Sequence, residues 1–159
     1  MTLFYDPEKA IDYSQKWALK RNPAYYDFEK LGGNCTNFVS QCLLAGGAVM
    51  NHTKASGWYY YSISERSPSW TSVEQLNLFL LNNRGRGPYG HLIDQADVMP
   101  GDIIQLSFEG HVFNHSGIIV KVDEDDIYFA QNSYDFKARP LSSRPHKKAR
   151  YIRIDGVRD

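Results

Sequence analysis

The sequence predicts an α+β fold in which a helical N-terminal half packs on an antiparallel β-sheet. Apolar residues recur at helical spacing in the first half of the chain, whereas short β-branched or aromatic runs separated by turn residues occupy the second half. Helices followed by adjacent strands are typical of this class. A length of 159 residues, of which 42% are hydrophobic, suits one core, so we expect a single domain over residues 1–159.

The first predicted helix begins at Pro7, because proline is favoured at the first helical position and Asp6 can cap the free N–H groups. Asn22-Pro23 is predicted to end it. The apolar residues of its buried face are Ala10, Tyr13, Trp17 and Ala18.

The second predicted helix follows Asn34, which is placed to act as its N-cap, and Gly46-Gly47 supplies the stop. One apolar face of this helix comprises Cys35, Phe38, Val39 and Cys42. We therefore expect this helix to be central and largely buried.

A third helix is predicted after Ser72, because Ser72 and Gln75 have the spacing of a capping box. Residues 48–70 show no regular period, and residues 84–90 have the composition of a loop. The predicted strands of the second half are residues 102–108, 116–122, 127–131 and 150–154.

Composition excludes several function classes. The 18 basic and 18 acidic residues balance, so no charge excess attracts nucleic acid or anionic lipid. No apolar run is long enough for a transmembrane helix, and the N-terminus lacks the pattern of a signal peptide. We expect a monomer that binds no nucleic acid and spans no membrane.

The two cysteines are expected to be free thiols. Cys35 and Cys42 on one helix would lie about 10 Å apart along its axis, too far for a disulfide. Two cysteines without Cys–x2–Cys spacing also make a poor zinc site. We predict no metal and no organic cofactor.

Cys35 is the strongest candidate for chemistry. A thiol at a helix N-terminus lies near the positive end of the helix dipole and free N–H groups, which favour a thiolate and can hold an oxyanion. Gly32-Gly33 directly before it would let a substrate approach the sulfur. The alternative is that Cys35 is a small buried residue, the usual fate of a free cysteine and the role we assign to Cys42.

A nucleophilic cysteine needs a base, and His115 is the best placed of the five histidines. It starts the apolar run Ser116 to Val120, so a strand would hold its ring rigidly. His111 is the next candidate, but it lies beside Gly110 in an apparent hairpin loop.

A third polar residue should orient the imidazole. Asn132 ends the strand over residues 127–131, next to the strand of His115, and is our first choice. It could equally be a turn former. The remaining candidates are Gln131, Asp135 and, more distant, Asp102.

The aromatic residues Trp58 and Trp70 could line a substrate groove, because flat rings bind sugars or peptides on their faces. The alternative is that both pack in the core of a long insertion. Asn34, adjacent to the nucleophile, is a further candidate for substrate contact.

The order of these motifs resembles the family of putative amidase domains, related to the CHAP and NlpC-type cell-wall hydrolases of the papain-like group. The likeness is carried by Asn-Cys-Thr-Asn-Phe-Val-Ser-Gln at residues 34–41, Gly-Asp-Ile-Ile-Gln-Leu at 101–106 and His-Ser-Gly-Ile-Ile-Val at 115–120. It extends to Asn22-Pro23-Ala24-Tyr25-Tyr26, to residues 41–47 and to the two tryptophans, and so covers most of the chain.

The resemblance implies a papain-like cysteine hydrolase with Cys35 as nucleophile, His115 as base and the third residue near Asn132. Many members have Asp before the cysteine and His as the third residue, where this chain has Asn34 and Asn132. The implied substrate is peptidoglycan, either its stem peptide or the sugar–peptide amide, which implies action outside the cell. The rivals are a cysteine transferase or deamidase acting on proteins, and an inactive cell-wall binding module with the same fold.

Overall fold

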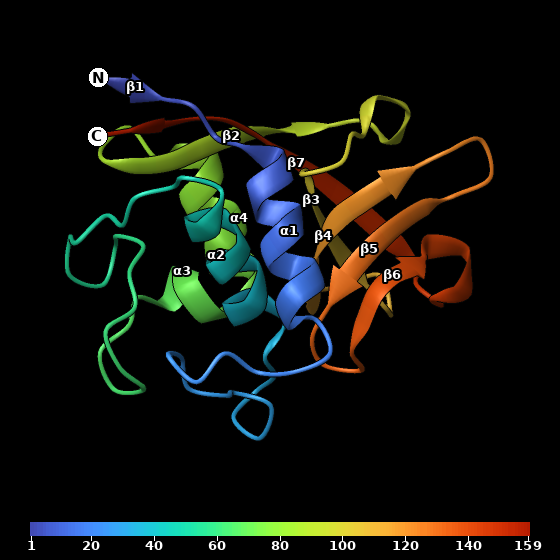
Figure 1. Ribbon diagram of the computed structural model, residues 1–159, viewed down its shortest axis with the longest axis horizontal. Helices are drawn as coiled ribbons and strands as arrows, with labels where there is room; N and C mark the ends of the chain where they lie inside the picture. The colour runs from blue at the N-terminus through green and yellow to red at the C-terminus, as the bar shows by residue number, and fades with distance from the viewer.

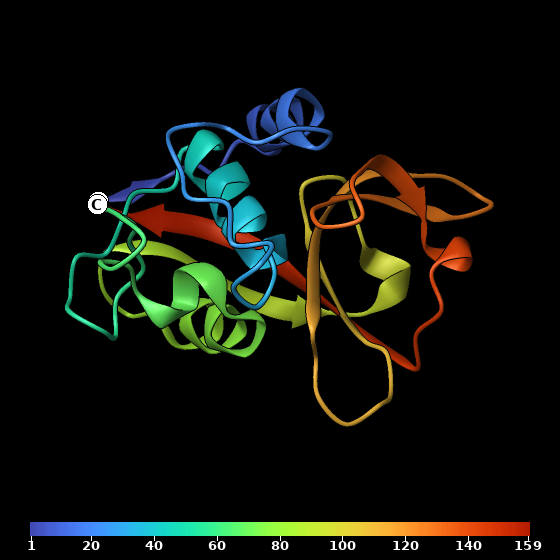
Figure 2. The same cartoon turned by 90° about the horizontal axis from the view of Figure 1, so that it is seen from below.

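The computed structural model describes residues 1–159 and has the predicted α+β architecture with an antiparallel sheet (Figure 1). The helices gather on one side of the molecule and most strands on the other. The last strand, β7 (Lys148–Arg158), runs from one side to the other and so belongs to both (Figures 1 and 2).

Four helices form the N-terminal half: α1 (Pro7–Trp17), α2 (Cys35–Ala45), α3 (Pro68–Thr71) and α4 (Val73–Asn82). The structure confirms the predicted starts of α1, α2 and α4. None of the helices is both long and apolar enough to cross a membrane.

Local capping explains two of these starts. The Asp6 carboxylate accepts hydrogen bonds from the N–H groups of Glu8 and Lys9, with Pro7 at the first position of α1. The Ser72 hydroxyl accepts a hydrogen bond from the N–H of Gln75 at the start of α4.

The sheet contains seven strands, in the order β1-β7-β3-β4-β5-β6, with β2 also paired to β7. Besides β7, they are β1 (Thr2–Leu3), β2 (Gly87–Ile93), β3 (Ile103–Ser107), β4 (His115–Val122), β5 (Ile127–Gln131) and β6 (Phe136–Pro140). All pairings are antiparallel. The register that matters for the site pairs Ile118 with Ala130 and Ile119 with Phe129.

Besides the two-residue strand β1, two strands were not predicted. Residues 87–93 form β2 although residues 84–90 were expected to be a loop, and residues 136–140 form β6. Each of these strands pairs with only one neighbour. Glycine, proline and charged residues are tolerated on such edge strands, because one edge of the strand makes no backbone hydrogen bonds to another strand. The amino-acid composition of β2 and β6 therefore did not indicate that they form strands.

The ends of other elements also differ from the prediction. The first helix ends at Trp17 rather than at Asn22, and the Asn22 side chain instead bonds Tyr13 and the N–H of Ala24. Because asparagine side chains compete with the helix for nearby backbone groups, a turn replaces the last helical residues. The short helix α3 lies in the segment without periodicity, and β7 is longer at both ends than predicted.

Apolar side chains form a core on each face of the sheet. Ile118 and Ala130 pack with Phe38 and Cys42 under the helices, so the expected core role of Cys42 is confirmed. A second cluster around Phe129 fills the opposite face. Figure 2 shows the later strands curling away from the helices. The second cluster takes its side chains from β3, β4, β5 and β7, among other segments.

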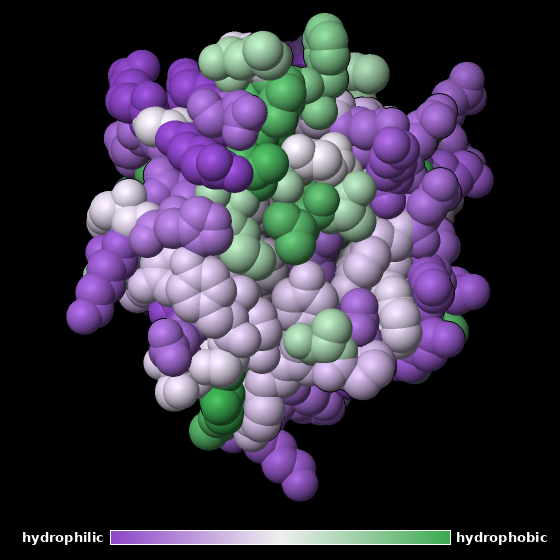
Figure 3. All heavy atoms as spheres, turned by 60° about the vertical axis from the view of Figure 1, so that its left-hand side comes forward, coloured by the Kyte–Doolittle hydropathy of each residue, from purple (hydrophilic) through white to green (hydrophobic).

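A third cluster joins α2, α4 and β7 around Trp58 and Trp70, which are both fully buried. Their ring centroids lie 4.6 Å apart. Figure 3 shows the face over this side of the molecule, where hydrophobic atoms form only a narrow band among neutral and hydrophilic side chains.

Candidate active site

Cys35 is the first residue of α2 and lines a pocket at the ends of β4 and β5. The pocket has a volume of about 150 Å³, and His115 and Gln131 line it too. This volume is below the roughly 300–1,000 Å³ of sites that enclose a drug-sized ligand, so the pocket suits a few atoms around one bond. Cys35 and Cys42 are both free thiols, as predicted.

The two glycines before Cys35 leave the sulfur side of the pocket open. Gly32 and Gly33 have φ angles of 89° and 105°, a left-handed conformation that favours glycine. No atom lies within 4 Å of where a Cβ would stand on either residue. Both glycines line the pocket, so a substrate backbone can pass over them toward Cys35.

His115 is the first residue of β4, as the sequence predicts, and is only 8% exposed. Its Nε2 lies 3.0 Å from Oε1 of Gln131. The amide nitrogen of Gln131 donates to the carbonyl oxygens of Ser133 and Tyr134, which can only accept. Since both hydrogens of that amide are used, its Oε1 must accept from His115, and Nε2 of the imidazole carries the proton.

The other ring nitrogen of His115, Nδ1, is therefore unprotonated in the neutral imidazole and is free to accept a proton. Gln131 is itself held by two backbone carbonyls, so the ring orientation and the tautomer are both fixed. A fixed imidazole with one unprotonated nitrogen meets the requirement of a general base. His115 and Cys35 line the same pocket, and the side-chain hydrogen-bond partner of the Cys35 sulfur is Thr36.

Asn132, the first choice for the third residue, does not contact His115. Its amide nitrogen donates to the carbonyl of Ala18 at 2.8 Å, and its oxygen accepts from Asn34 at 3.1 Å. Successive side chains of a strand point to opposite faces, so Gln131 shares the face of Phe129 and His115 while Asn132 shares the face of Ala130. The prediction of Asn132 was wrong because it ignored this alternation.

The two aspartates considered for the third role are engaged elsewhere. Asp135 pairs with Arg21 at 2.9 Å, and Asp102 pairs with Arg153 at 2.9 Å and accepts the N–H of Met99. Gln131 is therefore the candidate that the structure brings to His115.

Burial sets the protonation of the pair. Burial raises the pKa of the Cys35 thiol, although the N–H of Ser116 and the hydroxyl of Thr36 act in the opposite direction. Burial also lowers the pKa of His115 to about 4, although the hydrogen bond that His115 donates to Gln131 acts in the opposite direction. Both shifts favour a neutral thiol and a neutral imidazole, in contrast to the thiolate expected from the position at the helix N-terminus.

A buried hydrogen-bond chain supports the floor of the site. The Thr36 hydroxyl lies 3.7 Å from the Cys35 sulfur and 3.0 Å from the Ser116 hydroxyl. Gln105 donates to the same Ser116 hydroxyl and accepts from Arg150. The chain ties α2 to β4, β3 and β7 directly below the sulfur, and neither Thr36 nor Ser116 was singled out from the sequence.

Trp58 and Trp70, two of the residues predicted to contact substrate, do not reach the surface, whereas Asn34 lines the same pocket as Cys35 and His115. The Asn34 side chain is 2% exposed and bonds the N–H of Phe28 and the side chains of Asn37 and Asn132. It occupies the N-cap position of α2 but makes no capping hydrogen bond. Both tryptophans have no exposed surface, because they fill the core as in the alternative interpretation.

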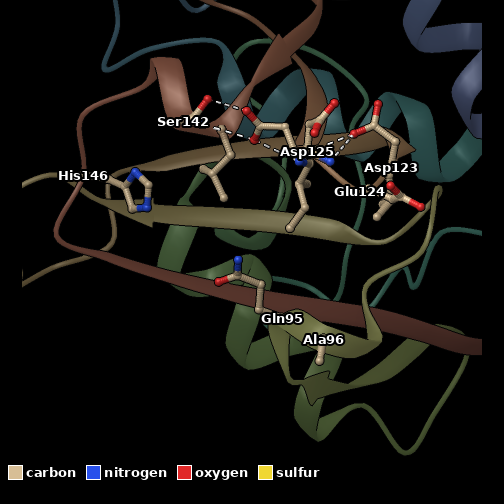
Figure 4. Close-up of a pocket in the computed structure, with 11 residues that line it drawn as sticks. Gln95, Ala96, Asp123, Glu124, Asp125, Ser142 and His146 are labelled. Atoms are coloured by element: carbon tan, nitrogen blue, oxygen red, sulfur yellow. Dashed lines mark hydrogen bonds between the residues drawn. The ribbon is translucent and has the colours of Figure 1, made fainter.

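The largest hollow of the molecule, about 770 Å³, lies away from Cys35 and His115, between the β4–β5 turn and residues 95, 96, 141, 142 and 146 (Figure 4). Two of its four acidic residues, Asp123 and Asp126, are committed to local structure. Asp123 accepts the N–H groups of Asp125 and Asp126, and Asp126 bonds Ser142. No group of three or more His, Cys, Asp or Glu side chains is placed to hold a metal ion.

Residues 4–154 match the family described as "Putative amidase domain". The chain is 38% identical over 139 residues to "Uncharacterized protein YhbB" of Bacillus subtilis (strain 168), a match that covers 85% of this chain and 43% of that protein. No solved structure matches. With nearly its whole length matched, the chain belongs to the putative amidase domain family.

Proposed function

We propose that this protein is a cysteine-dependent hydrolase of amide bonds, with Cys35 as nucleophile, His115 as general base and Gln131 as the residue that orients the imidazole. The observation that carries the proposal is the fixed tautomer of His115 in the pocket that Cys35 also lines. Membership of the family supports the reaction class.

In the first half-reaction, Nδ1 of His115 takes the thiol proton while the Cys35 sulfur attacks the carbonyl carbon of the substrate. The negative charge moves to the carbonyl oxygen, where the N–H groups of the first turn of α2 are available to stabilise it. The imidazolium then gives its proton to the leaving nitrogen. The carbon–nitrogen bond breaks, an amine leaves and a thioester on Cys35 remains.

In the second half-reaction, water attacks the thioester carbon and gives a proton to His115. The carbon–sulfur bond breaks, the sulfur regains the proton from the imidazolium, and a carboxylic acid leaves. A neutral resting pair is compatible with this cycle, because the base must start without a proton and the charges form only during attack.

We propose peptidoglycan as the substrate, cut in its stem peptide or at the amide that joins peptide to sugar. The support is the resemblance of the motifs to cell-wall hydrolases of the papain-like group. The pocket is small, and its side lined by Gly32 and Gly33 is open. This shape suits an extended peptide of which only the scissile amide enters the site.

The test is digestion of purified peptidoglycan, with mass analysis of the released fragments. The wild type should release fragments with a new amine and a new carboxyl group, whereas Cys35→Ala and His115→Gln should release none. Cys42→Ala is the matched control, since it removes the other thiol from the core of the same helix and should retain turnover.

Circular dichroism and thermal unfolding confirm that each variant is folded. Fragment release by a folded Cys35→Ala variant would refute the cysteine mechanism. Repeating the digestion with an added amine separates hydrolysis from transfer, because a transferase would join that amine to the new carbonyl. A wild type that binds peptidoglycan without releasing any fragment would instead be a binding module.

A further inference from the structure

Arg144 adds an unneutralised positive charge to the pocket that holds Cys35 and His115. None of the eleven residues that line this pocket is acidic. The Arg144 guanidinium forms no ion pair and donates no hydrogen bond within the protein, whereas the nearby Arg139 donates to Ser143. Because all its donors are free and it lies beside the candidate site, this arginine is available to bind a polar group of the substrate.

The fold holds this guanidinium in place without using its donors. It stacks on the ring of Phe108 at 3.8 Å from the ring centroid. The Phe108 ring in turn lies 6.0 Å from the His115 ring, in a stacked arrangement. The Arg144 backbone N–H donates to the carbonyl of Leu141 and closes the short 3-10 turn Leu141–Ser143. The side chain is thus positioned by packing, while its N–H groups remain available for a ligand.

Arg144 and His115 line the same pocket, so the charge also acts on the catalytic base. Together with Arg139, it adds to the effect of burial in lowering the pKa of His115. An anion beside Arg144 would compensate this positive charge. No acidic side chain of the protein does so, and the substrate is the remaining source.

We infer that Arg144 is the receptor for a substrate carboxylate close to the scissile amide, so the enzyme selects peptides that carry a free acidic group there. The planar guanidinium fork matches a carboxylate with two parallel hydrogen bonds. A carboxylate is the anion that a peptide offers, so this inference rests on the proposed amide hydrolysis. It adds the chemical class of the substrate to that proposal.

The peptidoglycan digestion defines which amide is cut, and two synthetic peptides that span this bond provide the test. One has its carboxyl groups free, and the other has them converted to carboxamides. The wild type should favour the free acid about tenfold or more in kcat/KM, since hydrogen bonds to charged groups are worth more than neutral ones. In Arg144→Met this ratio should fall to about one, and Arg144→Lys should restore it only in part.

Arg139→Met is the matched control. Arg139 stacks on Phe136, carries the same charge and does not line the pocket, so its loss should leave the preference for the acid unchanged. A wild type that cuts both peptides equally, or a preference that survives in Arg144→Met, would overturn the inference while leaving amide hydrolysis intact.

A binding measurement separates the two proposals if turnover is absent. Calorimetric titration of Cys35→Ala with each peptide should show tighter binding of the free acid, and the double variant Cys35→Ala, Arg144→Met should lose that difference. Equal affinity for the two peptides in Cys35→Ala, including binding of neither, would refute the role of Arg144.

Discussion

The burial of neutral His115 makes folding stability sensitive to acid in a predictable way. The unfolded chain has a histidine with a pKa of 6.5, whereas the folded state lowers that pKa to about 4. Between these two values the unfolded state binds a proton that the folded state does not, so the free energy of unfolding falls as the pH falls. The contribution is complete above pH 6.5 and is lost progressively toward pH 4.

The size of this effect follows from the two pKa values. Relative to neutral pH, the protonation of His115 should cost about 2 kcal/mol of stability at pH 5 and about 3 kcal/mol at pH 4. This is a large share of the roughly 5–15 kcal/mol by which a domain of ordinary size is stable.

Urea unfolding followed by tryptophan fluorescence measures the effect, because Trp58 and Trp70 are fully buried. The wild type and His115→Gln are compared between pH 7 and pH 4, and the difference between their pH slopes isolates the histidine. Glutamine keeps a polar partner for Gln131 but does not titrate. His111→Gln, a change at an exposed loop position, is the matched control and should keep the slope of the wild type.

Parallel curves for the wild type and His115→Gln would refute the reasoning. They would mean that the folded protein protonates His115 as readily as the unfolded chain does, and hence that the imidazole is not enclosed as the structure shows.

Three other predictions concern the supports of the site. Gln131→Glu should move the acid limb of the pH–rate profile upward from about 4, because a carboxylate 3.0 Å from His115 favours the imidazolium; a profile identical to the wild type would exclude contact between residues 115 and 131. Thr36→Val should destabilise the fold by about 1–2 kcal/mol in urea unfolding, because it leaves the buried Ser116 hydroxyl without one partner; an unchanged midpoint would contradict this network. Gly117→Ala should cost about 1–3 kcal/mol in the same assay, because its Cβ would lie 2.8 Å from the Phe129 ring; a stability equal to the wild type would show that the sheet yields there.

Local sequence signals were sufficient to place the two candidate catalytic residues. Cys35 follows two glycines at a helix start, and His115 begins an apolar run, and each pattern has a direct conformational meaning. The antiparallel sheet and the separation of helices from strands were likewise predictable from periodicity. Edge strands such as β2 were not, because an edge tolerates glycine and proline that a central strand excludes.

The third residue could not be chosen from the position of a strand end alone. Gln131 and Asn132 are adjacent, so the choice depends on which face of the sheet each side chain takes. That face is fixed by the pairing of Ile118 with Ala130, a contact between strands that no local pattern reveals. Arg144 was missed for a related reason. Its position at the pocket depends on stacking against Phe108, which lies 36 residues earlier in the chain.

Asn132 and Asn34 explain how the two halves of the site keep their spacing, although neither side chain bonds to His115. Asn34 directly precedes Cys35, and Asn132 directly follows Gln131. Their side chains bond each other at 3.1 Å inside the protein, and Asn132 also holds the carbonyl of Ala18 after α1. A shift of the helix start would therefore move the end of β5 with it. Because that strand end carries Gln131, the hydrogen-bond partner of His115, one buried amide pair positions Cys35 and Gln131 together.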